Sequence, residues 1–102
     1  MADQITVIAR IKAKAGLEET VRNEVLALVE PTRSESGCIN YDLHQSLDDP
    51  SVFVLYENWV SKEALDEHLA MPYLEAFKAK ADQLLAEPLD ISLWKMISQP
   101  GS

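Results

Sequence analysis

Two hydrophobic repeats alternate along the chain. Residues 5–11 carry large apolar side chains at every second position, the repeat of a half-buried strand. From Leu17 onward the apolar positions recur at intervals of four and three, which predicts a helix. The apolar stripe of this helix consists of Leu17, Val21, Val25 and Leu28. Pro31 should kink or end the helix, and Gly37 is a natural stop.

The strand pattern then returns twice. Residues 38–47 alternate, with Ile39, Tyr41 and Leu43 expected on one face, and residues 52–59 are rich in β-branched and aromatic side chains. Asp48-Asp49-Pro50 between these two runs is typical of a turn. The two runs therefore predict a β-hairpin.

Helical signals follow the hairpin. Ser61 is a good N-cap for a short helix that reaches Ala70. Pro72 suits the first turn of another helix, whose buried side should contain Leu74 and Phe77. Residues 89–97 alternate again and predict a fourth strand.

The element order is therefore β-α-β-β-α(α)-β. This order predicts an α+β fold of the ferredoxin-like split βαβ type, with an antiparallel sheet and helices on one face. Large apolar groups such as Ile8, Trp94 and Met96 occur on the strand side that the helices cannot cover. We expect a homodimer that pairs this second face. The 102 residues should form a single domain, 1–102, with a core of about residues 5–97.

Charge and composition restrict the partners. The net charge of −8 disfavours nucleic acid, and no apolar run approaches the roughly 20 residues of a membrane helix. The single cysteine, Cys38, cannot form an internal disulfide, which favours a reducing compartment. We therefore expect a cytoplasmic protein with no nucleic-acid or membrane partner.

The familiar catalytic signatures are absent from this sequence. It has no Gly-rich phosphate loop, no nucleophile elbow and no His-Glu-x-x-His. His44 and Asp42 could share a strand face, but no third metal ligand is evident, so a surface pair is the better interpretation. No base is evident for Cys38, which we interpret as a small buried residue.

Four polar and aromatic side chains are the candidates for chemistry: Glu57, Asn58, Trp59 and His68. Glu57 and Trp59 share a strand face by alternation, and His68 follows on the next helix. A buried carboxylate near an imidazole would shift both pKa values and could move protons. The structural alternative is a core tryptophan, a packing histidine and a bracing carboxylate.

Three further runs of the sequence stand out: Ser36-Gly37-Cys38-Ile39-Asn40-Tyr41-Asp42-Leu43-His44, Tyr56-Glu57-Asn58-Trp59 and Ser61-Lys62-Glu63-Ala64-Leu65-Asp66-Glu67-His68-Leu69. In their order and spacing, these runs resemble the antibiotic biosynthesis monooxygenase family. The resemblance implies a dimeric α+β barrel and a monooxygenase that oxidises a small aromatic, phenolic or quinol substrate with O2. It also implies that no flavin, haem or metal cofactor is needed.

The resemblance implies that Glu57, Trp59 and His68 line or support the cavity. The proposed oxidation needs an apolar pocket, a proton acceptor and a donor for the developing oxyanion, and this suggests roles for single residues. His68 would be the acid/base, Trp59 a cavity wall, and Asn58 or Tyr73 a hydrogen-bond donor. Glu57 would orient His68 or line the substrate site. Many members have a histidine where this chain has Tyr73. The haem-degrading branch uses an Asn and a His where this chain has about Ala9 and Phe77, and we include Phe77 among the substrate-binding candidates.

Two other functions remain open at this point, because one fold hosts many activities. One is an isomerase that uses the same cavity without consuming O2. The other is a non-catalytic, ligand-binding dimer, which a cavity too small for an aromatic ring would favour.

Overall fold

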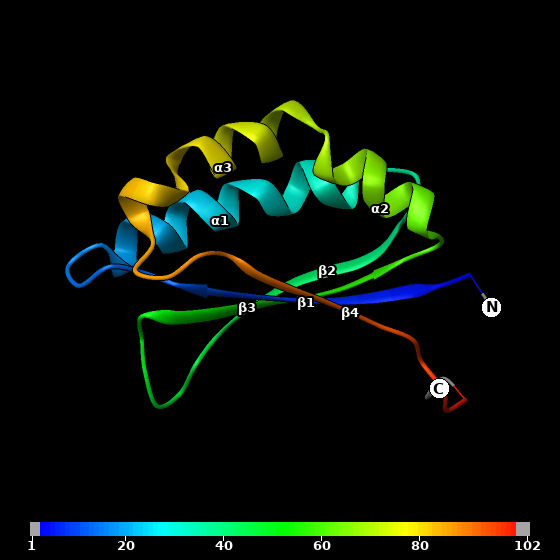
Figure 1. Cartoon of the computed structure of the whole chain (residues 1–102), viewed down its shortest axis with the longest axis horizontal. Helices are drawn as coiled ribbons and strands as arrows, with labels where there is room; N and C mark the ends of the chain where they lie inside the picture. Colours follow the sequence, from blue (N-terminus) through cyan, green and yellow to red (C-terminus); the bar gives the residue numbers. More distant parts are fainter. Residues whose placement is uncertain (1–2, 100–102) are drawn as a thin grey trace.

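The computed structural model describes residues 3–99, and in them four strands form one antiparallel sheet. The strands are β1 (Ile5–Lys12), β2 (Cys38–Gln45), β3 (Val52–Trp59) and β4 (Asp90–Trp94), and they lie side by side in the order β2-β3-β1-β4. The helices of these residues, α1 (Glu18–Arg33), α2 (Lys62–Leu69) and α3 (Pro72–Leu84), all cover one face (Figure 1). The predicted α+β, ferredoxin-like fold is confirmed. The four strands of one chain leave the sheet open, so a barrel needs a second chain.

The helix ends follow local signals, with one exception. The Ser61 side chain accepts a hydrogen bond from the backbone N–H of Ala64 at 3.1 Å, and Pro72 is the first residue of α3. The exception is α1, which continues through Pro31 and ends at Arg33, before Gly37. A proline inside a helix removes only one backbone donor. The last turn closes instead with bonds from the Ser34 N–H to the carbonyls of Glu30 and Pro31, both at 3.2 Å.

The covered face of the sheet holds the core. The predicted stripe of β1 is buried there at Val7, Ala9 and Ile11, and the α1 stripe packs above it. The prediction that Ile39 shares a face with Tyr41 was wrong. The pairing of β2 with β3 is irregular between Cys38 and Asn40, and Ile39 is 51% exposed while Tyr41 is buried.

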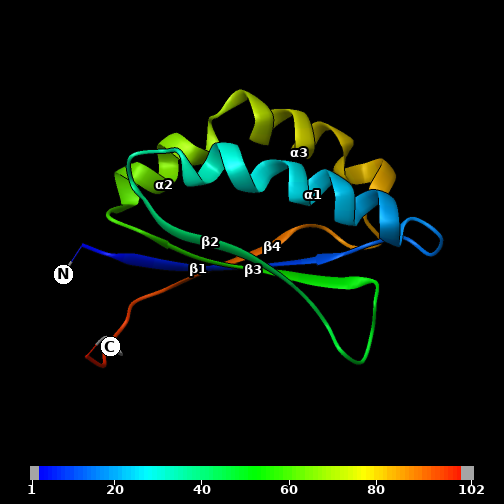
Figure 2. The ribbon, with the colours of Figure 1, turned by 180° about the vertical axis from the view of Figure 1, so that it is seen from behind.

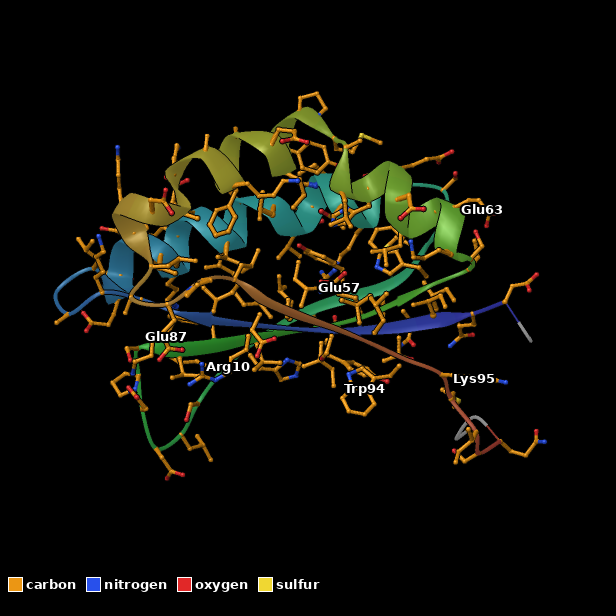
Figure 3. The ribbon with its side chains drawn as sticks, in the orientation of Figure 1. Arg10, Glu57, Glu63, Glu87, Trp94 and Lys95 are labelled. Atoms are coloured by element: carbon orange, nitrogen blue, oxygen red, sulfur yellow. The ribbon has the colours of Figure 1, made fainter. Side chains whose placement is uncertain are left out.

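Within residues 3–99, no part of the chain forms a second layer on the open face of the sheet, and Figure 2 shows this from behind. Tyr56 and Trp94 are exposed there, and Figure 3 shows Trp94 pointing away from the helices. Strand β4 is shorter than the predicted 89–97 because Trp94 already pairs with Thr6, near the start of β1. The last part of the tail, 100–102, lies outside the described residues, as do residues 1 and 2.

Candidate functional site

An apolar cavity of about 30 Å³ lies between the covered face of the sheet and the helices. Its walls come from all four strands, the three helices and the segment that leads into β4. They consist of Val7, Ala9, Ile11, Leu28, Tyr41, Leu55, Glu57, Leu65, His68, Leu69, Leu74, Phe77, Leu89 and Ile91. Glu57 and His68 are the ionisable groups of this wall with acid/base chemistry near neutral pH.

Glu57 extends from β3 toward the helices (Figure 3) and is only 4% exposed. Its carboxylate accepts a hydrogen bond from the indole N–H of Trp59 at 2.9 Å. Burial raises the pKa of Glu57 to about 7, against the lowering effect of the Trp59 bond, and the charge of Glu35 raises it further. A carboxyl group with this pKa can accept or release a proton at neutral pH.

His68 lies on the inner side of α2 and is 2% exposed. Its ring lies against Trp59, with centroids 4.5 Å apart and planes inclined by 35°. Tyr41 contacts the ring edge-on, at a centroid distance of 5.5 Å. Burial lowers the pKa of His68, while the neighbouring carboxylate of Glu35 acts to raise it. The imidazole is therefore neutral at physiological pH and can accept a proton.

Glu35 completes this group, and the sequence analysis missed it. It lies in the loop between α1 and β2, and its Oε2 is 2.9 Å from Nδ1 of His68. The same oxygen accepts the hydroxyl hydrogen of Tyr73. Glu35 belongs to neither hydrophobic repeat, and it stands one residue before the run that resembles the family. Only the folded chain brings this loop to α2 and α3.

The predicted site residues fall into three groups. Glu57, His68 and Phe77 line the cavity. Trp59 is fully buried beside His68 and supports the wall, while the Tyr73 hydroxyl reaches Glu35 instead of the cavity.

Asn58 is not brought to the cavity. It follows Glu57 on β3, and successive side chains of a strand point to opposite faces. On the open face its side chain accepts from the Thr6 hydroxyl and donates to Asn40 Oδ1 at 2.9 Å. The structure therefore places Asn58 in a hydrogen-bond network across the strands.

Two other candidate groups show no sign of chemistry. Cys38 is partly buried, and burial raises the pKa of its thiol to about 11, which keeps it protonated. His44 is exposed, and its Nδ1 contacts the Asp42 carbonyl at 3.2 Å. Between residues 3 and 99, no three His, Cys, Asp or Glu side chains are grouped closely enough to hold a metal ion. None of the helices in that range has the length and hydropathy to cross a membrane.

Comparison with known proteins shows relatives over nearly the whole chain. A protein of Synechocystis named "Uncharacterized protein sll1783" is 35% identical over 94 residues, which are 92% of this chain and 64% of that protein. The chain therefore spans less than two thirds of this relative. "Putative monooxygenase Rv0793" of Mycobacterium tuberculosis is 34% identical over 93 residues, 91% of each chain.

Solved structures agree with this relationship. The structure of Rv0793 superimposes with a TM-score of 0.90 at 32% identity and covers 96% of this chain and 99% of its own. That of PA3566 from Pseudomonas aeruginosa has a TM-score of 0.90 at 34% identity, with 96% and 98% covered. The family described as "Antibiotic biosynthesis monooxygenase" matches residues 4–80. By sequence and by fold, the chain belongs to the antibiotic biosynthesis monooxygenase family.

Proposed function

We propose that this protein is a monooxygenase that oxidises small, neutral, hydroxylated aromatic molecules, phenols or quinols, with O2 and without a bound cofactor. One observation carries the proposal: a buried carboxyl group with a pKa of about 7 and a neutral imidazole line the same apolar cavity. Such a pair can remove and return protons in a place that excludes water. The family membership supports oxygen as the second substrate.

The chemistry needs little from the protein. Removing the proton of a phenol makes the ring electron-rich enough to donate an electron to O2. Conversion of a phenol to a quinone then balances, because one oxygen atom enters the ring and the other leaves as water with two hydrogens of the substrate. His68 would take the phenolic proton, and Glu57 would supply a proton to the reduced oxygen.

The charges around the cavity support a neutral substrate. Glu57 and Glu35 are both acidic, and the chain as a whole carries a net charge of −8. This arrangement disfavours carboxylates and phosphates. The apolar walls, Phe77 among them, favour an aromatic hydrocarbon body with few polar groups.

The size of the cavity favours a second candidate, a non-catalytic dimer. A cavity of about 30 Å³ holds about one water molecule. A buried site for a benzene ring needs about 150 Å³. Binding of an aromatic ring therefore requires the wall to move. The wall reaches the surface at Ile91, which is 40% exposed on the edge strand β4.

We also propose that two chains pair through their open sheet faces and close the dimeric barrel. The motive is exposed apolar side chains on that face, such as Tyr56 and Trp94. We propose the cytoplasm as the location, because Cys38 is the only cysteine and cannot form an internal disulfide.

Oxygen uptake tests the proposed reaction. The purified dimer should consume O2 with an anthrone or a naphthoquinol faster than heat-denatured protein does, after treatment with a metal chelator and removal of free flavin. With ¹⁸O2, one labelled atom should enter the product. Substrate conversion without O2 consumption would indicate an isomerase. Tight binding with no conversion would indicate the non-catalytic dimer.

A further inference from the structure

We infer that Glu35 is the positioning residue of the site, which holds the hydrogen of His68 on Nδ1 and keeps Nε2 free to accept a proton in the cavity. The effect of Glu35 on turnover rests on the proposed function. The position of the hydrogen on the His68 ring does not depend on that function, so it can be tested without a substrate.

The contacts of Glu35 define what it can do. Its side chain is 8% exposed, and Oε2 lies 2.9 Å from Nδ1 of His68. The Tyr73 hydroxyl donates to this same oxygen and also lies 3.3 Å from the Pro31 carbonyl. An ionised carboxylate only accepts hydrogen bonds, so Nδ1 has to be the donor. Glu35 is thus an acceptor shared by two donors, one on α2 and one on α3.

The surroundings of His68 fix its ring. Trp59 packs on the ring, and Tyr41 contacts its edge, so a half-turn of the ring, which would put Cδ2 in the place of Nδ1, meets buried aromatic side chains. Burial and the charge of Lys78 lower the pKa of His68, and Glu35 opposes both effects. The other ionisable groups near His68 are Glu57 and Tyr41, which line the cavity, and Tyr73, whose hydroxyl bonds to Glu35. The balance is a neutral imidazole whose second nitrogen, Nε2, carries the lone pair.

This arrangement matters for proton transfer. When Nε2 accepts a proton, the imidazole becomes a cation, and the Glu35 carboxylate stabilises it directly. Serine proteases use the same logic: replacing the aspartate that orients their histidine by asparagine keeps the geometry but lowers kcat by about 10⁴. Tyr73 acts one step further away, because it orients Glu35.

Nuclear magnetic resonance of the imidazole nitrogens tests the inference directly. The chain has only two histidines, so a His44→Gln variant assigns both sets of signals. In the native protein at neutral pH, Nδ1 of His68 should be protonated and Nε2 should not. A hydrogen on Nε2 in the native protein would overturn the inference, whatever happens in the variants.

Two variants remove the carboxylate acceptor. Glu35→Ala leaves Nδ1 without this partner, so the Nε2-protonated form of His68 should become populated. Glu35→Gln keeps the volume, but its amide can donate an N–H to Nδ1, so the hydrogen should move to Nε2, as in the aspartate-to-asparagine change of the serine proteases. Glu30→Gln is the matched control, because Glu30 is exposed on α1 and its loss changes the net charge equally. An unchanged His68 in folded Glu35→Ala would contradict the inference.

Kinetics then measure the consequence. Glu35→Ala should lower kcat by about 10²-fold, the scale of a general acid–base contribution, and change KM much less. Glu35→Gln should lower kcat at least as much, because its amide can hold the hydrogen of His68 on Nε2. If no oxygenase activity is found, the proposed function fails while the nitrogen signals still decide the role of Glu35. If the native protein turns over and Glu35→Ala retains its full kcat, the positioning role fails alone.

Discussion

The two faces of the sheet handle buried polar groups in opposite ways, although alternate residues of the same strands build them. Glu57 and Asn58 are neighbours on β3, and each is 4% exposed. Asn58 bonds through both its amide oxygen and its amide nitrogen, to side chains of β1 and β2. Glu57 receives the Trp59 N–H and faces an apolar cavity. The cost of burial therefore appears at Glu57 as a raised pKa.

The same contrast separates chemistry from assembly. On the covered face, the ionisable groups Glu57 and His68 lie inside a shell that excludes water. On the open face, the polar network includes Thr6, which pairs with Trp94, an exposed aromatic residue that points away from the helices (Figure 3). A surface that combines satisfied polar groups with exposed aromatic groups resembles a protein interface more than a reaction site. Changes on the covered face should therefore alter turnover, and changes on the open face should alter association.

The largest effect is expected from removing β4, because this strand contributes to both faces. Strand β4 pairs with β1, and Leu89 and Ile91 line the cavity. A chain that ends at Pro88 should lose its cooperative thermal transition, as followed by circular dichroism. A chain that ends at Ile97 is the control and should melt like the full chain. A cooperative native-like melt of the shorter chain would contradict the role of β4.

Ionisation of Glu57 should make stability depend on pH. Its pKa is about 7 in the folded chain, against 4.5 for an ordinary glutamate side chain in water, so the folded state binds more protons between these pH values. Stability should be highest below pH 4.5 as far as this group is concerned, and should fall as the pH rises through 7. The shift corresponds to on the order of 3 kcal/mol.

Chemical denaturation between pH 5 and 8 measures this loss of folding stability with rising pH. The Glu57→Gln variant should show little of this pH dependence. Asn58→Ala is the matched control from the open face. It should cost about 1–3 kcal/mol at every pH, because it leaves partners unbonded without changing a charge. If the free energy of unfolding changes equally with pH in Glu57→Gln and in the native protein, Glu57 is not the titrating group.

Substitution of His68 should act on turnover more than on stability. His68→Gln keeps a similar volume and hydrogen-bonding capacity, so the fold and the association should survive. Oxygen uptake should fall by about two orders of magnitude, the usual contribution of a general acid–base group. A thermal melt recorded beside the kinetics separates the two effects. Full activity in a folded variant would assign His68 to packing and leave Glu57 as the proton acceptor to test.

Much of this fold could be predicted because the sequence features that determine it are local. Apolar residues that recur every two positions predicted the strands, and those that recur every three or four positions predicted the helices. Ser61 and Pro72 predicted where two helices begin. The incorrect predictions concern features that depend on contacts between distant parts of the chain. The exposure of Ile39 depends on how β2 pairs with β3 between Cys38 and Asn40, and the length of β4 depends on where β1 begins.

The site was predictable to the same extent. Alternation put Glu57 and Trp59 on one face, and this same rule argued against Asn58, which the sequence analysis had nevertheless included. The family resemblance supported His68. Glu35 could not be found from the sequence pattern, because a loop residue has no periodicity and its partners are 33 and 38 positions away.

Association should respond to the open face, with the smallest effect among these changes. Trp94 is 55% exposed on β4, and aromatic side chains of this kind are frequent interface anchors. The native chain should sediment at about twice its mass of 11.4 kDa, and Trp94→Glu should weaken dimerisation by about tenfold or more.

Leu47→Glu is the matched control, because Leu47 is fully exposed in the turn between β2 and β3 and lies off the sheet. Within residues 3–99 the Trp94 side chain hydrogen-bonds to Ser92 alone, so the protomer should melt almost unchanged. A native monomer, or equal dissociation of the Trp94→Glu and Leu47→Glu dimers, would remove the open face as the interface.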